Sequence, residues 1–511
     1  MIKLSNVKIK PFEDDRALLA KSAKKAGVNV SEVKYFKLVK KSLDARDKSN
    51  IFYNCSVELS LKEYKKPLKV YGKVKKSAEI LVVGMGPAGL FCALDLQRYG
   101  FNVTLIERGK AVDERSQSID SFIKTSVLDE DCNIQFGEGG AGAFSDGKLN
   151  TGVGGALSRE VIDDFLSFGA PSEIDYLQKP HIGSDKLKGV VKNIRNEIIR
   201  LGGKVFFSTK LSDIEILNGK VKSVTINGER RVFDEVVLAV GHSARDVYYM
   251  LERRGVMMES KDFAVGLRIE HLQKDINFSQ YGSFAGTLGM PVADYKLTTN
   301  FNGRGVFTFC MCPGGYVMPS ASEKETIVTN GMSNFLRDGE NANSAVICQV
   351  NKKDFGASLF GGIEFQKDLE RNAFILGGGD YRAPSTLVGD YLTGNNSEGF
   401  GKVKPTYPMG VKKADVSKLF SADINASLKF AITDMARRLK GFDVYDAVLT
   451  GVESRTSSPV RVIRGDNCQS VSAENLYPCG EGCGYAGGIT SAGADGKKVA
   501  KAIAIKYGLE F

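Results

Sequence analysis

The feature that most constrains this chain is a glycine-rich turn between a strand pattern and a helix pattern within residues 79–107. Residues 79–83 (EILVV) form a short apolar run typical of a buried parallel strand, and a glycine follows directly. A helix pattern covers 90–98, Gly100 ends it, and 102–107 (NVTLIE) has the pattern of a second strand. The segment therefore predicts a βαβ unit of about 30 residues.

The turn itself, GMGPAG at residues 84–89, fits G-x-G-x-x-G in the context that this motif requires. Its glycines permit a tight turn, close approach of a pyrophosphate, and packing of the helix on the strand. Free N–H groups at the helix N-terminus favour an anion. Pro87 is tolerated there because an N–H at the first helical position would have no partner within the helix. Glu107 ends the second strand, where its carboxylate can accept hydrogen bonds from ribose hydroxyls and repel a 2′-phosphate. These residues predict a dinucleotide site.

A second glycine-rich segment indicates which dinucleotide to expect. Residues 476–481 (LYPCGE) run from a strand pattern into Gly480 and Glu481, and GGITSA at 487–492 opens an amphipathic helix that continues to residue 506. A carboxylate at a strand end followed by a helix N-terminus suits a ribityl chain and a flavin, whose reduced form carries negative charge near N1. The pattern favours FAD over NAD.

Five stretches of the chain resemble a bacterial family often named FAD-dependent or NAD(FAD)-utilising dehydrogenases, which has the glutathione-reductase-type FAD fold. The resemblance implies FAD at the first turn, with Glu481 in place of the Asp that more usually meets the ribityl chain. It also favours flavin contact by the loop at 136–149, for which glycine content alone would equally suggest a surface loop. The stretches are 82–89 with 107–109, 136–149 (FGEGGAGAFSDGKL), 238–241, 451–459 (GVESRTSSP) and 477–492 (YPCGEGCGYAGGITSA).

The motif and the resemblance together predict a set of cofactor-binding residues from four separate segments. They are Gly84, Gly86, Pro87, Ala88, Gly89, Glu107, Arg108, Arg115, Ala143, Ser145, Asp146, Gly147, Lys148, Gly241, Gly480, Glu481, Gly488, Ile489, Thr490 and Ser491.

Two cations are candidate catalytic residues, Arg455 and Lys148. An arginine beside a flavin could hold a carboxylate substrate or stabilise developing negative charge, whereas a surface salt bridge is the structural alternative. His242 follows the strand pattern at 235–240 and could lie near the cofactor, although a structural role is the simpler interpretation.

The nine cysteines indicate reduced thiols and no metal site. Neither Cys310 with Cys312 nor Cys479 with Cys483 has the spacing of a zinc or iron–sulfur site. The helix after the glycine turn carries only Cys92, which disfavours the dithiol chemistry of the disulfide reductases with this fold. Cys479 and Cys483 near the flavin segment leave redox activity open, with small buried residues as the simpler interpretation.

The predicted fold class is α/β: a glutathione-reductase-type, Rossmann-like FAD-binding domain with a β-meander, an inserted α+β substrate domain and a small N-terminal α+β domain. Asn-Gly pairs at 218–219 and 227–228 separate three short strand patterns and predict the meander. We expect an N-terminal domain and linker at 1–77, FAD-binding parts at 78–247 and 452–511, and the insert at 248–451.

Charge is unevenly distributed along the chain. Residues 1–77 hold 20 Lys and Arg against 8 Asp and Glu, a net +12, whereas the whole chain is +10. Lysines 34, 37, 40 and 41 and Arg46 lie near Tyr35 and Phe36, which suits contact with RNA phosphates and bases, but a solvated face or a protein-docking surface is the preferred interpretation. The absence of a signal-peptide pattern or long apolar run predicts a cytoplasmic protein without a membrane partner.

The function expected from these patterns is FAD-dependent oxidoreduction, with hydride transfer between a small molecule and flavin N5. NAD(P)H is a possible transient reductant, because no second dinucleotide motif is present to bind it permanently. A flavoprotein acting on tRNA, and a module that binds FAD for structure or sensing, are the alternatives. The sequence names neither the substrate nor the direction of transfer.

Overall fold

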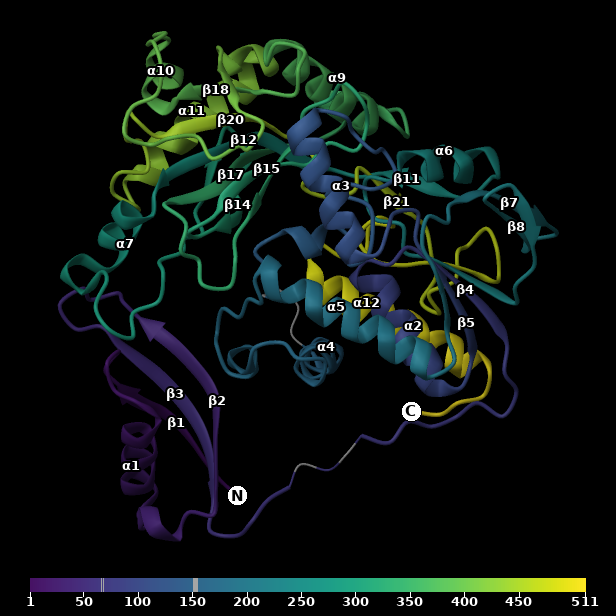
Figure 1. The fold of residues 1–511 in the computed structure, drawn as a ribbon, viewed down its shortest axis with the longest axis horizontal. Coiled ribbons are helices and arrows are strands. Elements are labelled where there is room, and N and C mark those ends of the chain that lie inside the picture. The colour runs from purple at the N-terminus through teal and green to yellow at the C-terminus, as the bar shows by residue number, and fades with distance from the viewer. Residues whose placement is uncertain (66, 68, 150–154) are drawn as a thin grey trace.

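The structure is a computed structural model that describes residues 1–65, 67, 69–149 and 155–511. It has three parts, each with its own sheet. Figure 1 shows the N-terminal part at the lower left, a parallel sheet with its helices towards the right, and a large, mainly antiparallel sheet above them. Two of the three parts frame the candidate site.

A parallel sheet of five strands forms the base of the central part, with β4 at its middle. Its strands are short and apolar, and β10 is buried on both faces because helices and the meander cover the two sides. The βαβ unit predicted from the glycine turn is confirmed. In sheet order the strands are β22 (Leu476–Pro478), β10 (Glu235–Leu238), β4 (Glu79–Val83), β5 (Asn102–Ile106) and β6 (Lys204–Phe206).

Three helices, α2, α5 and α12, cover one face of this sheet and lie side by side in Figure 1. A buried ion cluster ties α12 to its neighbours: the Lys497 ammonium lies 3.0 Å from Asp95 of α2 and 2.6 Å from Asp164 of α4. Segments 402 residues apart in sequence thus form one layer. The helices of this part are α2 (Pro87–Tyr99), α3 (Val112–Thr125), α4 (Ala156–Ser167), α5 (Ser184–Arg200), α6 (Arg245–Arg253) and α12 (Ile489–Lys506).

The predicted three-stranded meander is confirmed, with strands β7 (Leu211–Leu217), β8 (Lys220–Ile226) and β9 (Glu229–Arg231). Helix α6 packs on it through Val247, Met250 and Leu251, so that the first FAD-binding part extends past residue 247 to the end of this helix.

The insert is built on a seven-stranded sheet that sequence patterns did not resolve. Strand β20 crosses residue 451 and stays hydrogen-bonded to β12 as far as Glu453, so the insert ends later than expected. The strands, in order, are β13 (Thr298–Phe301), β14 (Arg304–Cys312), β17 (Asn341–Val350), β12 (Phe263–Leu272), β20 (Val448–Glu453), β18 (Ala383–Leu387) and β19 (Val411–Lys413). Around them lie α7 (Gln273–Tyr281), α8 (Lys352–Phe355), α9 (Gly361–Leu376), α10 (Val388–Thr393), α11 (Ala422–Ala436) and the pair β15 (Tyr316–Pro319) and β16 (Thr329–Met332). A short pair, β11 (Met258–Ser260) and β21 (Val460–Val462), joins the two crossings between insert and central part.

The N-terminal part has one helix, α1 (Asp15–Ala26), on a sheet of β1 (Ile2–Ile9), β3 (Phe52–Ser60) and β2 (Tyr35–Asp44). Its first strand escaped sequence analysis, because an irregularity between Leu4 and Val7, with Asn6 in the left-handed region, shifts the apolar alternation. The part docks on the insert through the Tyr53 hydroxyl, which donates to the Gly289 carbonyl at 3.0 Å.

In the part of the chain that the structure describes, no helix is both long and apolar enough to cross a membrane.

Candidate functional site: a dinucleotide cavity under the insert

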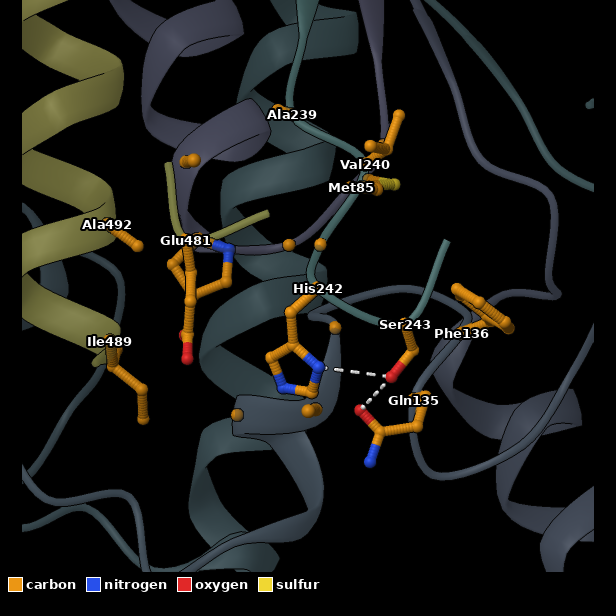
Figure 2. A pocket seen from close by; sticks show the side chains of 18 of the residues that line it. Met85, Gln135, Phe136, Ala239, Val240, His242, Ser243, Glu481, Ile489 and Ala492 are labelled. Carbon is orange, nitrogen blue, oxygen red and sulfur yellow. Dashed lines mark hydrogen bonds between the residues drawn. The ribbon is translucent and has the colours of Figure 1, made fainter. Parts of the chain in front are cut away.

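A cavity of about 340 Å³ opens at the carboxyl ends of β4 and β10, where open parallel sheets place their ligands. One end is lined by the glycine turn and Glu107, and the other by residues of the insert. Figure 2 shows its middle, where Glu481 and Ile489 lie on one side of His242 and Gln135 and Phe136 on the other.

The glycine turn is packed too closely for side chains. A Cβ on Gly84, which has φ +98°, would lie 2.4 Å from the Ala239 carbonyl oxygen, and one on Gly89 would lie 1.9 Å from the Gly84 oxygen. A Cβ on Gly140, from the second glycine-rich loop, would come within 3.0 Å of the Gly86 Cα. The two loops therefore expose bare backbone to the cavity, as close approach of a pyrophosphate requires.

Two helices point their N-termini at this cavity, and neither has a side-chain cap. Gly86 precedes α2 and Gly488 precedes α12, and both glycines line the cavity. The first N–H groups of each helix remain available to a ligand with negative charge, and the helix dipole adds to the attraction. The cavity thus offers two separate anion-binding points on backbone alone.

Glu107 organises the end of the cavity next to the glycine turn through backbone contacts. Its Oε2 accepts from the Met85 N–H at 2.8 Å, and its Oε1 accepts from the N–H groups of Gly109 at 2.9 Å and Gly137 at 3.0 Å. The carboxylate lines the cavity while joining the glycine turn to the loop at 136–149. Its neighbour Arg108 also lines the cavity and pairs with Asp246.

Arg115 was expected at the cofactor, but its side chain lies fully buried beneath the second glycine loop. Its guanidinium donates to the backbone carbonyls of residues 133, 134, 137, 138 and 140, and it does not line the cavity. Arg115 therefore shapes the loop that meets the cofactor and has no contact of its own with the cavity. The sequence could not distinguish an arginine that contacts the cofactor from one that supports the glycine loop, because either would lie close to glycines.

Glu481 and His242 face each other across the middle of the cavity (Figure 2). Burial raises the pKa of Glu481 to about 7, with Lys261 opposing and Cys310 adding to the shift. Burial, together with the charges of Arg455 and Arg245, lowers the pKa of His242 to about 3, so that the imidazole is neutral. Its Nδ1 lies 3.1 Å from the Ser243 hydroxyl, which donates to the Gln135 side chain.

The far end of the cavity is contributed mainly by the insert. Lys148 reaches it from the second glycine loop, and its ammonium donates to Asp146 at 2.7 Å and to the Met311 carbonyl. Burial lowers the pKa of Lys148, but Asp146 and the two nearby cysteines outweigh it, and the net shift is upward. The insert residues that line this end are Phe309, Cys310, Asn330, Glu453, Arg455 and Thr456.

Arg455 lines the cavity, but its charge is balanced within the protein. Its guanidinium forms a bidentate pair with Glu370, at 2.9 and 2.8 Å. The Arg245 guanidinium also donates two hydrogen bonds to the same carboxylate. The two arginines hold the pKa of Glu370 well below its usual range, against the opposing effect of burial. This triad joins α6, α9 and the end of β20, so a structural role accounts for most of what Arg455 does.

Two protein families match the chain on either side of residue 266. Residues 78–266 match a family described as pyridine nucleotide-disulphide oxidoreductase, and residues 262–456 match one described as FAD-dependent protein, C-terminal domain-like. An uncharacterized protein of Clostridium beijerinckii is 43% identical, with 99% of each chain covered. The chain belongs to the same family as this protein, within the FAD-dependent oxidoreductases. Its cofactor is FAD, and the glycine cradle with two open helix N-termini fits that molecule.

Other comparisons are more distant. Residues 1–60 match a domain of unknown function. Among solved structures, CtdE in complex with FAD is 12% identical at a TM-score of 0.33 and covers 84% of each chain. A geranylgeranyl bacteriochlorophyll reductase-like protein from Thermoplasma acidophilum is 13% identical at 0.36, with 84% of this chain and 79% of that chain covered.

Most residues predicted for this flavoenzyme's site lie on the cavity, but six do not line it: Gly89, Arg115, Ala143, Gly480, Thr490 and Ser491. Gly89 and Gly480 instead allow close packing, since a Cβ on Gly480 would lie 2.6 Å from that of Ala88. The Thr490 hydroxyl donates to the Leu149 carbonyl, and that of Ser491 to the Gly488 carbonyl. Phe309, Asn330, Glu453 and Thr456 of the insert were missed because no local motif marks them, whereas Arg455 was predicted and lines the cavity. The cavity also includes Met85, Gln135, Phe136, Thr209, Lys210, Val240, Ser243 and Val247.

The basic N-terminal cluster of the flavoenzyme is partly used within the chain. Lys37 pairs with Asp175 at 2.9 Å, Arg46 pairs with Asp44, and the backbone of Lys41 bonds to residues 176 and 178. Lys34 and Lys40 are exposed. Contact with RNA at this face stays a prediction, and docking of the domain on its own chain accounts for the charge of Lys37.

Proposed function

We propose that this protein is an FAD-dependent dehydrogenase or reductase that transfers a hydride between a small-molecule substrate and flavin N5. The observation that carries the proposal is the division of the cavity. Backbone N–H groups and glycines line the part next to β4, whereas polar and charged side chains of the insert line the far part. The first part suits a held dinucleotide and the second suits an exchanged substrate.

Each part of the cavity has residues in place for its task. The N-terminus of α2 and the bare backbone of Gly86 and Gly140 would hold the pyrophosphate, and Glu107 would meet the adenosine ribose. The N-terminus of α12 would stabilise negative charge, and Glu481, with its raised pKa, can carry a proton near neutral pH. FAD, when bound, supplies the hydride chemistry.

The insert residues would orient the substrate and exclude water. At the far end of the cavity, Lys148 is a less enclosed cation than Arg455, because its side chain keeps 28% exposure while that of Arg455 keeps 2%. We assign to Lys148 the task of meeting a negatively charged or carbonyl group of the substrate. We further propose NAD(P)H as a transient reductant at this open end.

The test is the visible absorption spectrum of the purified protein before and after anaerobic addition of NADH or NADPH. Flavin bands that bleach support a nicotinamide-reducible oxidoreductase. Bands that persist would contradict the nicotinamide part and direct the search to substrates that reduce the flavin directly. A colourless protein that takes up no added FAD would overturn the proposal.

The Lys148→Met variant sharpens this test. It should keep its flavin bands but bleach more slowly, by about tenfold or more if Lys148 stabilises charge during transfer. Lys274→Met, an exposed lysine on α7, is the matched control and should bleach at the unaltered rate.

A further inference from the structure

Two cysteines of the insert meet at the far end of the FAD cavity. Cys310 is partly exposed and, among the described residues, is the one cysteine that lines this cavity. Cys312 lies directly behind it and is fully buried. Both are free thiols, and the Cys312 thiol lies close enough to the Cys310 side chain to affect its pKa.

The backbone is bent at this point in a way that brings the two thiols together. Strand β14 pairs with β17 at Phe309 and again at Cys312, but the register shifts between them, so β14 carries one extra residue. Cys310 takes up the bend with φ +43°, in the left-handed region that side chains other than glycine seldom adopt. A bulge of this kind re-aims side chains and is common beside active sites.

Two cations hold the bend in place. Lys148 donates to the Met311 carbonyl, and the Arg268 guanidinium donates to the Cys310 carbonyl at 3.2 Å. The Cys312 thiol also donates to that carbonyl at 3.2 Å. Gly331 leaves room for this arrangement, because a Cβ there would lie 2.2 Å from Arg268 and 2.8 Å from the Cys312 sulfur.

The same groups shift the pKa values of the two thiols in opposite directions. The hydrogen bond from Cys312 and the charges of Lys148 and Arg268 lower the pKa of Cys310, against the opposing effects of burial and Glu453. The hydrogen bond and burial raise the pKa of Cys312. Cys310, the partly exposed member of the pair, therefore forms the thiolate more readily than the buried Cys312, as in other reactive cysteine pairs.

We infer that Cys310 and Cys312 form a redox-active dithiol that exchanges two electrons with FAD bound in this cavity. The inference rests on the bound FAD of the proposed function. In the oxidising direction, the Cys310 thiolate and the Cys312 thiol together lose one proton and two electrons as an S–S bond forms, while oxidised FAD takes up the two electrons and that proton and becomes reduced. The reverse direction breaks the S–S bond and returns the flavin to its oxidised form.

This assignment differs from the expectation that dithiol chemistry is disfavoured. That expectation concerned the helix after the glycine turn, where Cys92 of α2 is indeed alone and fully buried. The pair at 310–312 comes from β14 of the insert, and Cys310 lines the cavity. Cys479 and Cys483 are both buried and do not line the cavity.

The test is an anaerobic reductive titration of the air-oxidised holoprotein, followed by its flavin absorption. Wild type should take up about twice as much dithionite per flavin as Cys310→Ser or Cys312→Ser, because a disulfide adds a second two-electron couple. Cys348→Ser is the matched control, a buried cysteine of β17 outside the cavity, and should take up as much as wild type.

A second measurement needs no variant. After denaturation in an alkylating reagent, the peptide with residues 310–312 should carry no alkyl groups from the oxidised holoprotein and two from the reduced one. Equal uptake by wild type and both serine variants, or a peptide alkylated twice in both states, would overturn the inference. Flavin bands in those same samples would show that the proposed function survives, whereas their absence would count against that function.

Discussion

The two ends of the FAD cavity are built by different means. Near Glu107 the lining is backbone from one continuous βαβ unit, and its one carboxylate is engaged by three N–H groups. Near Cys310 the lining is side chains from β14, β16 and β20, which come together only through the insert's tertiary structure. Substitutions can alter the first end little, because backbone atoms line it, whereas each side chain that lines the second end can be replaced separately. Cofactor retention should therefore depend on the first end and chemistry on the second.

The largest effect is expected at the glycine turn. Gly84→Ala would place a Cβ 2.4 Å from the Ala239 carbonyl in a backbone conformation with φ +98°. We expect a loss of about 3 to 4 kcal/mol in the free energy of unfolding and little FAD in the purified protein. Thermal unfolding and the ratio of flavin to protein absorption measure both.

A glycine with free space serves as the control for this change. Gly189→Ala lies in α5 with no atom within 4 Å of the added Cβ, and should leave stability equal or slightly higher. Normal flavin content in Gly84→Ala would show that the turn tolerates side chains and would break the comparison between the two ends.

Glu481, between the two ends, should give the next largest effect. Its pKa of about 7 in the folded protein lies above the 4.5 of an unperturbed glutamate, so between these values the folded protein holds a proton that the unfolded chain has released. Stability from this group is complete below about pH 4.5 and is lost as the pH rises through 7, by about 2 to 3 kcal/mol. Urea unfolding of the apoprotein at pH 5 and pH 8 measures this loss.

Glu481→Gln should remove that part of the pH dependence, because the amide does not titrate. Glu474→Gln, at an exposed glutamate nearby in sequence, should leave the slope as in wild type. Identical slopes in wild type and Glu481→Gln would contradict the burial of an uncompensated carboxyl group in the cavity.

Glu107→Gln tests the role of the carboxylate at the end of the cavity that is lined by backbone. The amide keeps one acceptor and turns an NH₂ group towards a backbone N–H, so we expect a loss of about 2 kcal/mol and FAD binding weaker by about tenfold. Fluorescence titration of the apoprotein with FAD measures the affinity. Glu229→Gln, at an exposed residue of the meander, is the control, and an unchanged FAD affinity in Glu107→Gln would refute the role of the carboxylate.

The smallest effect in free energy is expected at the far end. In Lys148→Met the pKa of Cys310 should rise by about one unit, because a cation that stabilises its thiolate is gone. Alkylation of Cys310 at pH 7 should slow by about tenfold while FAD content stays within about twofold. Loss of FAD from this variant would mean that the two ends share the task of holding the cofactor.

The sequence predicted the parts of the fold that short-range signals encode. The glycine turn, the Asn-Gly turns of the meander and the apolar faces of α5 and α12 are each visible within about 20 residues, and the structure contains all of them. The insert was not resolved, because its sheet depends on long-range pairs: β12 lies between β17 and β20, roughly 75 and 180 residues further along. No local pattern specifies such partners.

The same distinction holds at the site. Gly84, Gly86 and Glu107 belong to one motif and were predicted from it, and the structure places them on the cavity. Cys310 was noticed as half of a C-x-C pair without a recognised spacing, and its role depends on a bulge and on two cations from distant segments. For Arg115, the sequence predicted a position near the cofactor loop, but it could not predict that the side chain points into that loop and away from the cavity.

The buried ion cluster of Lys497 with Asp95 and Asp164 has a consequence for folding during synthesis. Residues of α12 leave the ribosome about 400 residues after the glycine turn, which at typical synthesis rates is roughly 20 to 80 s. During that interval the nascent chain has α2 without its main packing partner and β10 without β22. The flavin pocket therefore cannot be complete until both the glycine turn and the N-terminus of α12, which line it together, have been synthesised.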